Sequence, residues 1–343
     1  MNVVKSTNPI VWESGKVNDY LHLVDLKQFG MPNACSIFIA EFNESVVIID
    51  CGTSMDTRKI LGYIKQNDIQ LDQVKYIVAS HYHFDHIGGL WKLYENVKKS
   101  NPEVQIFANL LTMQRLNNFE NESHFTRSKK TWGALTGKFK KIEESAFRII
   151  KDNEYFDFEE DITHPLEEFS LNHNKIGLAF LKTPGHSPDH ISPLFIREGN
   201  VDFLYLGESM GGLAHSQNLK TIPSCVAPDF KHETYMQSVN KIKELTPLNG
   251  GLAHYGLITG RENVLELIED NESLMKEFRQ KIIEFYSEKP ETRYVFNKAA
   301  AHFGTKERIE NMLEEDDPAY QTFVKFFVSM IYGMMMDLGY KKD

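Results

Sequence analysis

The six residues His81-Tyr82-His83-Phe84-Asp85-His86, followed by Gly88-Gly89, place three imidazoles and a carboxylate in one short stretch. Such a cluster is costly in water, because neighbouring imidazolium rings repel, and costly when buried, because unpartnered polar rings lose their hydration. Divalent metal ions bind neutral imidazole nitrogen and carboxylate oxygen directly. The stretch therefore predicts a metal site, and a purely structural role is the less favoured interpretation.

The segments on either side of this stretch predict a strand and a helix. Residues 74–80 are short, apolar and β-branched, and the sequence from Ile87 onward has apolar residues at helical spacing. Ligand sites in open α/β sheets lie just beyond the carboxyl ends of strands, where this turn belongs. We expect His81 and His83 to face one point and Asp85 and His86 a second, so that one loop supplies ligands to two ions.

The pattern H-x-H-x-D-H resembles the signature of the metallo-β-lactamase superfamily, and four further motifs of that family occur here in the same order. Asp50-Cys51-Gly52-Thr53 follows an apolar segment and is similar to the first motif. Thr183-Pro184-Gly185-His186-Ser187 is similar to the third, Glu208 stands at the fourth, acidic position, and His254 at the fifth. The resemblance covers about residues 17–260.

This resemblance implies a fold, two cofactor ions and a set of ligands. The fold is α/β, a metallo-β-lactamase-like four-layer αβ/βα sandwich, and the cofactors are two divalent metal ions, zinc first, with iron or manganese as alternatives. The implied ligands of one ion are His81, His83 and His186, those of the other are Asp85, His86 and His254, and Glu208 spans both. Asp85 is also implied in catalysis. Asp50 would orient a ligand; His190 would either do the same or pack at the start of a strand.

Glu208 departs from the family pattern, which usually has aspartate at this position. The extra methylene adds about 1.5 Å of reach. Glu208 therefore bridges the two metals, binds only one, or swings away from both, and an ordinary exposed acid in a loop is the alternative to all three.

Composition sets the wider limits. With 343 residues, of which 41% are hydrophobic and 25% charged, the chain is expected to be an ordinary globular protein with one main domain and a smaller appended part. Its three cysteines are widely spaced, and its first residues lack a basic region followed by an apolar core, so we expect a cytoplasmic protein without a secretory signal. The net charge of -10 argues against nucleic-acid and anionic-membrane partners and favours a small-molecule substrate.

One local segment is basic despite the acidic total. It lies between His124 and Lys141 and contains Arg127, Lys129, Lys130, Lys138, Lys140 and Lys141. It either receives an anionic substrate at the mouth of the active site or is the solvated face of a helix, and the second reading is the more common for charge runs. His124 itself lacks metal-type spacing, so we interpret it as a surface or core residue.

The order of predicted elements divides the chain into residues 1–260, with a helical insertion at about 111–151, and a helical C-terminal extension at 261–343. Strands are predicted at 10–12, 20–26, 35–41, 45–49, 74–80, 104–108, 161–162, 176–181, 190–196, 201–206 and 251–253. Helices are predicted at 55–66, 232–244, 263–288, 293–302, 306–315 and 318–340.

The last predicted helix is strongly apolar. Its uncharged run between Lys325 and Asp337 is too short to span a bilayer, so its apolar surface must pack on something. The candidates are the main domain, a second copy in a homodimer formed through the C-terminal helices, or a substrate with an acyl or other hydrophobic tail.

Three function classes remain. The leading one resembles the glyoxalase II-like branch of the family, a metallohydrolase that uses a metal-bridging hydroxide on a small ester, thioester or lactone. The second is a non-hydrolytic di-iron protein that binds oxygen or transfers electrons. Flavin-coupled proteins of that type typically have glutamate where this chain has His83, which favours hydrolysis. The third is a phosphodiesterase of the same fold, which the acidic balance disfavours.

Overall fold

The computed structural model describes residues 8–156, 165–309 and 318–342. The strand predicted at 161–162 lies outside these residues, as does most of the helix predicted at 306–315. The described part of the latter, residues 306–309, is a turn that ends in an isolated bridge between Ile309 and Ala214.

The N-terminal half of the chain forms a seven-stranded sheet in the order β2-β3-β4-β5-β6-β7-β8. Its strands are β2 (Gly15–Lys16), β3 (Leu21–Asp25), β4 (Ser36–Glu41), β5 (Val46–Ile49), β6 (Val74–Val78), β7 (Gln105–Ala108) and β8 (Phe147–Ile149). From β5 to β8 the neighbouring strands pair in parallel. The carboxyl ends of β5 and β6 therefore lie together at one edge of the sheet.

A second seven-stranded sheet has the order β1-β16-β15-β12-β11-β10-β9. Its strands are β1 (Ile10–Val11), β9 (Glu167–Leu171), β10 (Asn174–Lys182), β11 (Ile191–Arg197), β12 (Asn200–Gly207), β15 (Asn249–Leu252) and β16 (Leu257–Thr259). Strands β12 and β15 are parallel, whereas the other pairs are antiparallel. A short hairpin of β13 (Gly212–Leu213) and β14 (Thr221–Ile222) stands apart from this sheet.

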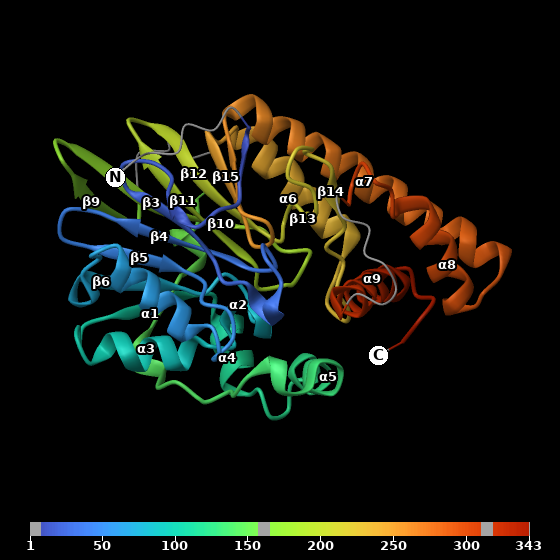
Figure 1. Ribbon diagram of the computed structural model, residues 1–343, viewed down its shortest axis with the longest axis horizontal. Coiled ribbons are helices and arrows are strands. Elements are labelled where there is room, and N and C mark those ends of the chain that lie inside the picture. The colour runs from blue at the N-terminus through green and yellow to red at the C-terminus, as the bar shows by residue number, and fades with distance from the viewer. Residues whose placement is uncertain (1–7, 157–164, 310–317, 343) are drawn as a thin grey trace.

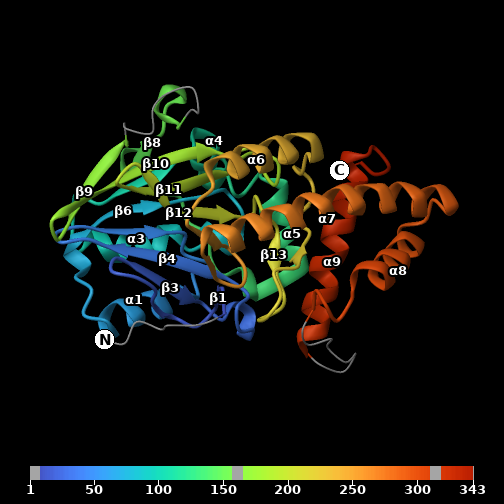
Figure 2. The same cartoon turned by 90° about the horizontal axis from the view of Figure 1, so that it is seen from above.

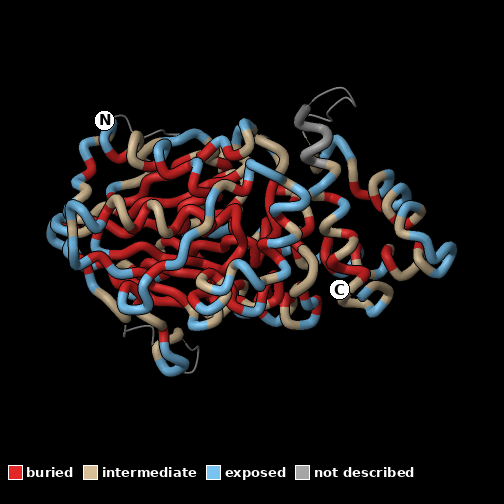
Figure 3. The backbone as a smooth tube through the Cα atoms, turned by 90° about the horizontal axis from the view of Figure 1, so that it is seen from below, coloured by how far each residue is buried: buried red, intermediate tan, exposed pale blue. Residues whose placement is uncertain are grey.

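The two sheets face each other, and helices cover their outer faces (Figure 1). One apolar core lies between the sheets and is rich in aromatic rings, among them Phe38, Phe203 and Tyr205. A second core joins the first sheet to α1 (Thr57–Gln66) and α3 (Leu90–Lys98), and a third joins the second sheet to α6 (His232–Leu245) and α7 (Arg261–Glu288). This is the expected αβ/βα sandwich, and Figure 3 shows the buried backbone concentrated in its sheets.

The segment predicted as a helical insertion is helical only in its first part. It contains α4 (Leu110–Asn117), α5 (Ser123–Trp132) and a 3-10 turn at Gly133–Thr136. The end of the predicted helical insertion was wrong, because Phe147–Ile149 form β8, the last parallel strand of the first sheet. The apolar residues Phe147, Ile149 and Ile150 fit the spacing of a helix as well as that of a strand, and pairing with β7 decided that Phe147–Ile149 form a strand.

The C-terminal extension is helical. Helix α7 runs from the end of the second sheet, α8 (Thr292–Phe303) turns back along it, and α9 (Pro318–Asp337) returns toward α5 (Figures 1 and 2). Phe327, Ile331, Met334 and Met335 of α9 are buried in the same core as α6 and α7. Part of the apolar surface of α9 thus packs on its own chain. None of the described helices is long and apolar enough to cross a membrane.

Candidate metal centre

The ends of five strands bring the predicted site residues together. Asp50 follows β5, residues 81–86 follow β6, and His186 follows β10. Glu208 directly follows β12, and His254 lies two residues after β15. Within the stretch after β6, Phe84–Ile87 forms the short helix α2, which displaces Asp85 and His86 from the two preceding histidines, as expected from the sequence.

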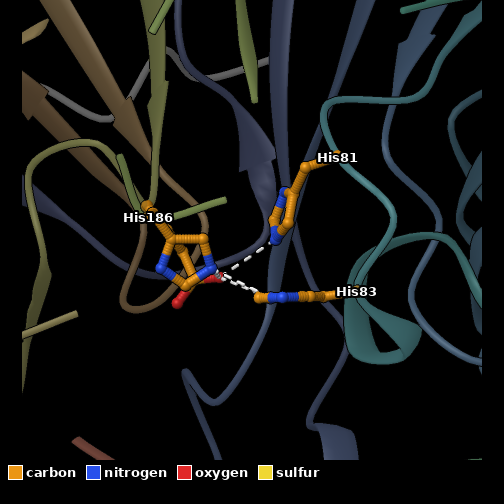
Figure 4. Close-up of side chains that lie close together, drawn as sticks. His81, His83 and His186 are labelled. Carbon is orange, nitrogen blue, oxygen red and sulfur yellow. Dashed lines mark hydrogen bonds and ion pairs between the residues drawn. The ribbon is translucent and has the colours of Figure 1, made fainter. Parts of the chain in front are cut away.

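One group of side chains converges on the carboxylate of Glu208. Its Oε2 lies 2.7 Å from Nε2 of His186, 3.2 Å from Nε2 of His81 and 3.8 Å from Nδ1 of His83. Figure 4 shows the three imidazole rings turned toward one another. All four side chains are buried, and each offers a ligand atom within 4.8 Å of the others, so together they can hold a metal ion.

Asp85, His86 and His254 form a second such group, with ligand atoms also within 4.8 Å of one another. Glu208 reaches this group as well, because its Oε2 lies 3.1 Å from Nε2 of His86 and its Oε1 lies 3.5 Å from Nε2 of His254. The longer side chain has not swung away, and it is no exposed loop acid. It stands between the two groups.

Hydrogen bonds select the histidine tautomers that suit metal binding. Nδ1 of His254 donates to the carbonyl of Ala34, and Nδ1 of His186 donates to the carbonyl of Ser224. Because a carbonyl only accepts, both histidines carry a proton on Nδ1, which leaves Nε2, the nitrogen nearer to Glu208, as the atom that can bind a metal. Two buried carboxylates and at least two imidazole lone pairs aimed at a common space are a donor set that fits divalent cations.

His81 is held by a chain of two hydrogen bonds, from its own ring to Ser80 and from Ser80 to Asp50. Asp50 accepts hydrogen bonds from the Ser80 amide at 2.9 Å, the Ser80 hydroxyl at 2.7 Å and the Tyr205 hydroxyl at 2.7 Å. The Ser80 hydroxyl has given its only proton to Asp50, so it accepts from Nδ1 of His81, 3.0 Å away. Asp50 thus orients His81 through Ser80, and it also lies 3.8 Å from Nδ1 of His86.

His190 lies beside the site, and its contacts are compatible with both roles left open by the sequence. Its Nε2 accepts from the backbone amide of Glu208 at 3.2 Å, and its Nδ1 lies 2.7 Å from the hydroxyl of Thr183. The ring also packs 5.1 Å from that of His81. His190 therefore positions the backbone that carries Glu208, besides filling space at the start of β11.

Burial governs the charges of these groups. It lowers the pKa of His81 well below its usual range and that of His83 to about 4, because a charged ring loses its hydration. Burial also opposes charge on His86, but Asp85 and then Glu208 raise its pKa to about 9. Burial would raise the pKa of Glu208, yet the surrounding histidines, His186 first, hold it well below its usual range. The Glu208 carboxylate is therefore ionised and the rings of His81 and His83 are neutral, which are the forms that bind metals.

The site opens into a cavity of about 1050 Å³. His83, Asp85, Glu208 and His254 line one part of it, and the remainder is lined by residues 30–34, by α5, by β13–β14 and by α9. The residues of the basic segment are divided between the cavity and the outer surface. Basic residues that line the cavity are Arg127 and Lys130, whereas Lys140 and Lys141 pair with exposed acids elsewhere.

Two residues near the candidate metal centre were missed by the sequence reasoning. His124 is buried and stacks on His83, with ring centroids 4.1 Å apart. Ser80 orients His81, and its position directly before the first histidine was a signal available in the sequence. Ser224 lies in the segment 221–225, which follows Glu208 closely enough in the sequence to line a pocket wall; it lines the cavity, and its hydroxyl lies 2.8 Å from Nδ1 of His186. His124 reaches the site only through the tertiary fold.

Comparison of the sequence with known proteins identifies one family and relatives within it. The sequence profile of the metallo-beta-lactamase superfamily matches residues 30–248, more than half of the chain. The metallo-beta-lactamase fold-containing protein ST1585 of Sulfurisphaera tokodaii is 28% identical over 243 residues, which are 70% of this chain and 79% of that protein.

Solved structures agree in fold. The crystal structure of ST1585 from Sulfolobus tokodaii, an archaeal metallo-beta-lactamase superfamily protein, matches with a TM-score of 0.59 and 20% identity, over 92% of this chain and 98% of that one. The family protein TTHA1429 from Thermus thermophilus matches with a TM-score of 0.57 and 12% identity, over 94% of each chain. A B3 metallo-beta-lactamase described as having an active site glutamic acid matches with a TM-score of 0.50 and 14% identity, over 78% of this chain and 91% of that one.

Proposed function

The chain belongs to the metallo-β-lactamase superfamily, and we propose that it is a metal-dependent hydrolase acting on a small ester, thioester or lactone. The observation that carries this proposal is the position of Glu208, whose carboxylate lies within 3.5 Å of imidazole nitrogens in both ligand groups. A carboxylate placed in this way suits a pair of ions that act on one substrate bond.

Each residue has a role in this proposal. His81, His83 and His186 would hold one ion, Asp85, His86 and His254 the other, and Glu208 would span them. Two such ions would supply hydroxide at neutral pH and stabilise the attacking and leaving oxygens. Asp85 lines the cavity with Oδ2 3.7 Å from Nε2 of His86, so its carboxylate is also available to accept a proton during catalysis.

Metal content tests the ligand assignment. Protein purified without added metal is analysed for zinc, iron and manganese, beside the variants His81→Ala and His254→Ala. We expect about two ions per chain in the wild type and the loss of at least one in each variant. His302→Ala is the matched control, because this histidine lies on α8 and bonds to Glu277. Full metal content in both ligand variants would contradict the assignment.

The reaction class is tested separately with thioester, lactone, phosphodiester and sulfate ester substrates. We expect turnover of a thioester, an ester or a lactone that is lost on chelation and in Glu208→Gln. Turnover of the phosphodiester alone would replace the proposed substrate class with that of a phosphodiesterase of the same fold.

A second candidate is a di-iron protein that binds oxygen or transfers electrons. The observation in its favour is the pair of carboxylates, Asp85 and Glu208, within the ligand set, because iron accepts carboxylate and imidazole together. A coloured protein that contains iron, bleaches on reduction and hydrolyses none of the substrates would support it. A colourless two-zinc protein would exclude it.

A further inference from the structure

The cavity at the metal centre extends well beyond the space that the predicted ligands surround. Its volume of about 1050 Å³ slightly exceeds the range for pockets that bury drug-sized molecules, roughly 300–1000 Å³. Four predicted metal ligands line one part, and α5 and α9 line the part away from them. A substrate cleaved at the metals therefore has room for a large group between these two helices.

Aromatic and apolar side chains line that outer part. Trp132 of α5 lies between two other rings, with its centroid 5.2 Å from Phe29 and 4.9 Å from Phe326 of α9. Met330 lines the cavity one turn further along α9, and Val328 is 40% exposed. A pocket wall of this composition gains free energy when an apolar ligand covers it.

The charged residues of the cavity outside the predicted ligands are all basic in the described part of the chain: Arg127, Lys130, Arg308 and Lys325. Arg308 is paired with Asp270. Lys130 is exposed, and Lys325 lies 5.2 Å above the Trp132 ring and 3.4 Å from the carbonyl of Thr131. In a chain of net charge -10, this concentration of one sign favours an anionic ligand.

We propose that the substrate is an anionic amphipath, an ester or thioester whose extended apolar group packs on Trp132, Phe326 and Met330 and whose anionic group binds Lys130 and Lys325. The proposal rests on the hydrolase function proposed above and specifies its substrate class. Continuity of the apolar wall with the metal centre, together with the basic side chains beside it, favours this occupant over a second copy of an acidic chain.

Alkane-1-sulfonates of four to ten carbons test the apolar part, because they are not hydrolysed and sulfonate is a weak metal ligand. Tryptophan fluorescence of the metal-loaded protein reports binding. We expect the affinity to rise about two- to fourfold for each added CH₂. The fluorescence response should vanish in Trp132→Phe and persist in Trp91→Phe, because Trp91 lies outside the cavity and bonds to the carbonyl of Lys138.

Two substitutions separate the apolar wall from the basic groups. Phe326→Ser should weaken decanesulfonate and decanol alike, by about tenfold, whereas Leu248→Ser, an exposed apolar residue outside the cavity, should weaken neither. Lys130→Gln combined with Lys325→Gln should weaken decanesulfonate roughly fivefold and leave decanol unchanged. Decyltrimethylammonium should bind the wild type more weakly than decanol.

Several results would overturn the proposal. If the affinity does not depend on chain length, the substrate does not carry the proposed apolar group. If the affinity does not depend on the charge of the head group, the substrate does not carry the proposed anionic group. A wild-type dimer that Phe326→Ser converts to a monomer, without binding of any probe, would assign the wall to a second copy of the chain. If sulfonates bind as expected while no ester or thioester is turned over, the hydrolase function fails and the binding site stands.

Discussion

At the scale of single residues, the geometry of the candidate metal centre depends on side chains that are not themselves predicted to bind metal. Asp50, Ser80 and Tyr205 form a buried hydrogen-bonded group whose effect is to leave Nε2 of His81 as the lone-pair nitrogen. Burial raises the pKa of Asp50, and the hydrogen bonds from Ser80 and Tyr205 offset part of this increase. Asp50 therefore helps to orient His81 although Ser80 lies between them in the hydrogen-bonded network.

Ser80→Ala tests this network. The substitution removes the hydroxyl that joins Asp50 to His81, so His81 loses the partner that selects its tautomer. We expect metal affinity to fall about 10–100-fold with the fold retained, as measured by competition with a chromogenic chelator. Ser100→Ala, at an exposed position after α3, is the control. An unchanged affinity would show that His81 is oriented by packing alone.

Most of the candidate site residues could be predicted from the sequence, because several of them are close together in the chain. His81, His83, Asp85 and His86 are close in the chain, and a dense group of ligands has few other uses. His124 could not be recognised, because its spacing from the other histidines carries no signal. Its contact with His83 exists only because α5 folds back over α2.

At the scale of elements, the loop that carries His186 is fixed against helix α6. Gly185 has a φ of 134°, and a Cβ at this position would lie 2.3 Å from the Cα of Tyr235. Its carbonyl also accepts a hydrogen bond from the amide of Lys231, just before α6. The glycine of the third motif is therefore required by the approach of two backbones, not only by a turn.

Gly185→Ala should destabilise the protein by about 3 kcal/mol, the sum of a strained backbone angle and a backbone clash. Gly199→Ala is the matched control, because Gly199 also has positive φ but has open space around its Cα, and it should cost only about 1 kcal/mol. Urea denaturation measures both. Equal effects of the two substitutions would mean that the His186 loop moves freely away from α6.

Asp270 joins three elements behind Arg308, a residue that lines the cavity. This residue of α7 accepts hydrogen bonds from the amide and hydroxyl of Thr221 in β14, at 2.8 and 2.9 Å, and from Arg308 after α8 at 2.9 Å. Burial would raise the pKa of Asp270, but Thr221 and Arg308 hold it below the ordinary value of 3.8. A depressed pKa in the folded state stabilises the protein above pH 3.8, and this contribution is lost as the pH falls through the folded-state pKa.

Asp270→Asn should therefore lower the free energy of unfolding by about 2 kcal/mol at pH 7. The difference from the wild type should stay constant between about pH 5 and 7 and shrink below about pH 4. Glu269→Gln, on the same helix in an exposed pair with Lys243, should change little at any pH. A difference that persists at low pH would show that packing, and not the ionised carboxylate, supplies the stability.

At the scale of the whole molecule, the metal centre lies where the two sheets and the C-terminal extension meet. Five histidines and two carboxylates from both sheets are gathered in one partly buried space, so a metal ion bound there would link the two halves of the sandwich. Residues of α9 line the part of the cavity away from the predicted ligands, so the C-terminal extension contributes to the cavity wall.

Removal of metal should consequently destabilise the whole chain. Ligand binding stabilises the native state by about 2.7 kcal/mol when free metal is about 100 times its Kd, so a chelator should lower the melting temperature and excess zinc should restore it. Glu208→Gln should show a much smaller response to the same treatment, because it lacks the carboxylate that reaches both ligand groups. Thermal unfolding that ignores the chelator would mean that the folded protein holds no metal.

The sequence alone determined the strand-and-turn positions of the site, because ligands that are adjacent in the chain and motifs that end apolar strands are local features. Pairing between distant strands decided what local patterns could not: that residues 147–149 form β8, and that the Glu208 carboxylate lies close to imidazole nitrogens of both groups of predicted ligands despite its extra methylene. The tertiary fold also places α5 and α9 around one cavity. Helical and strand periods are properties of a segment, whereas reach, tautomer and the shape of a pocket depend on what the rest of the chain places opposite it.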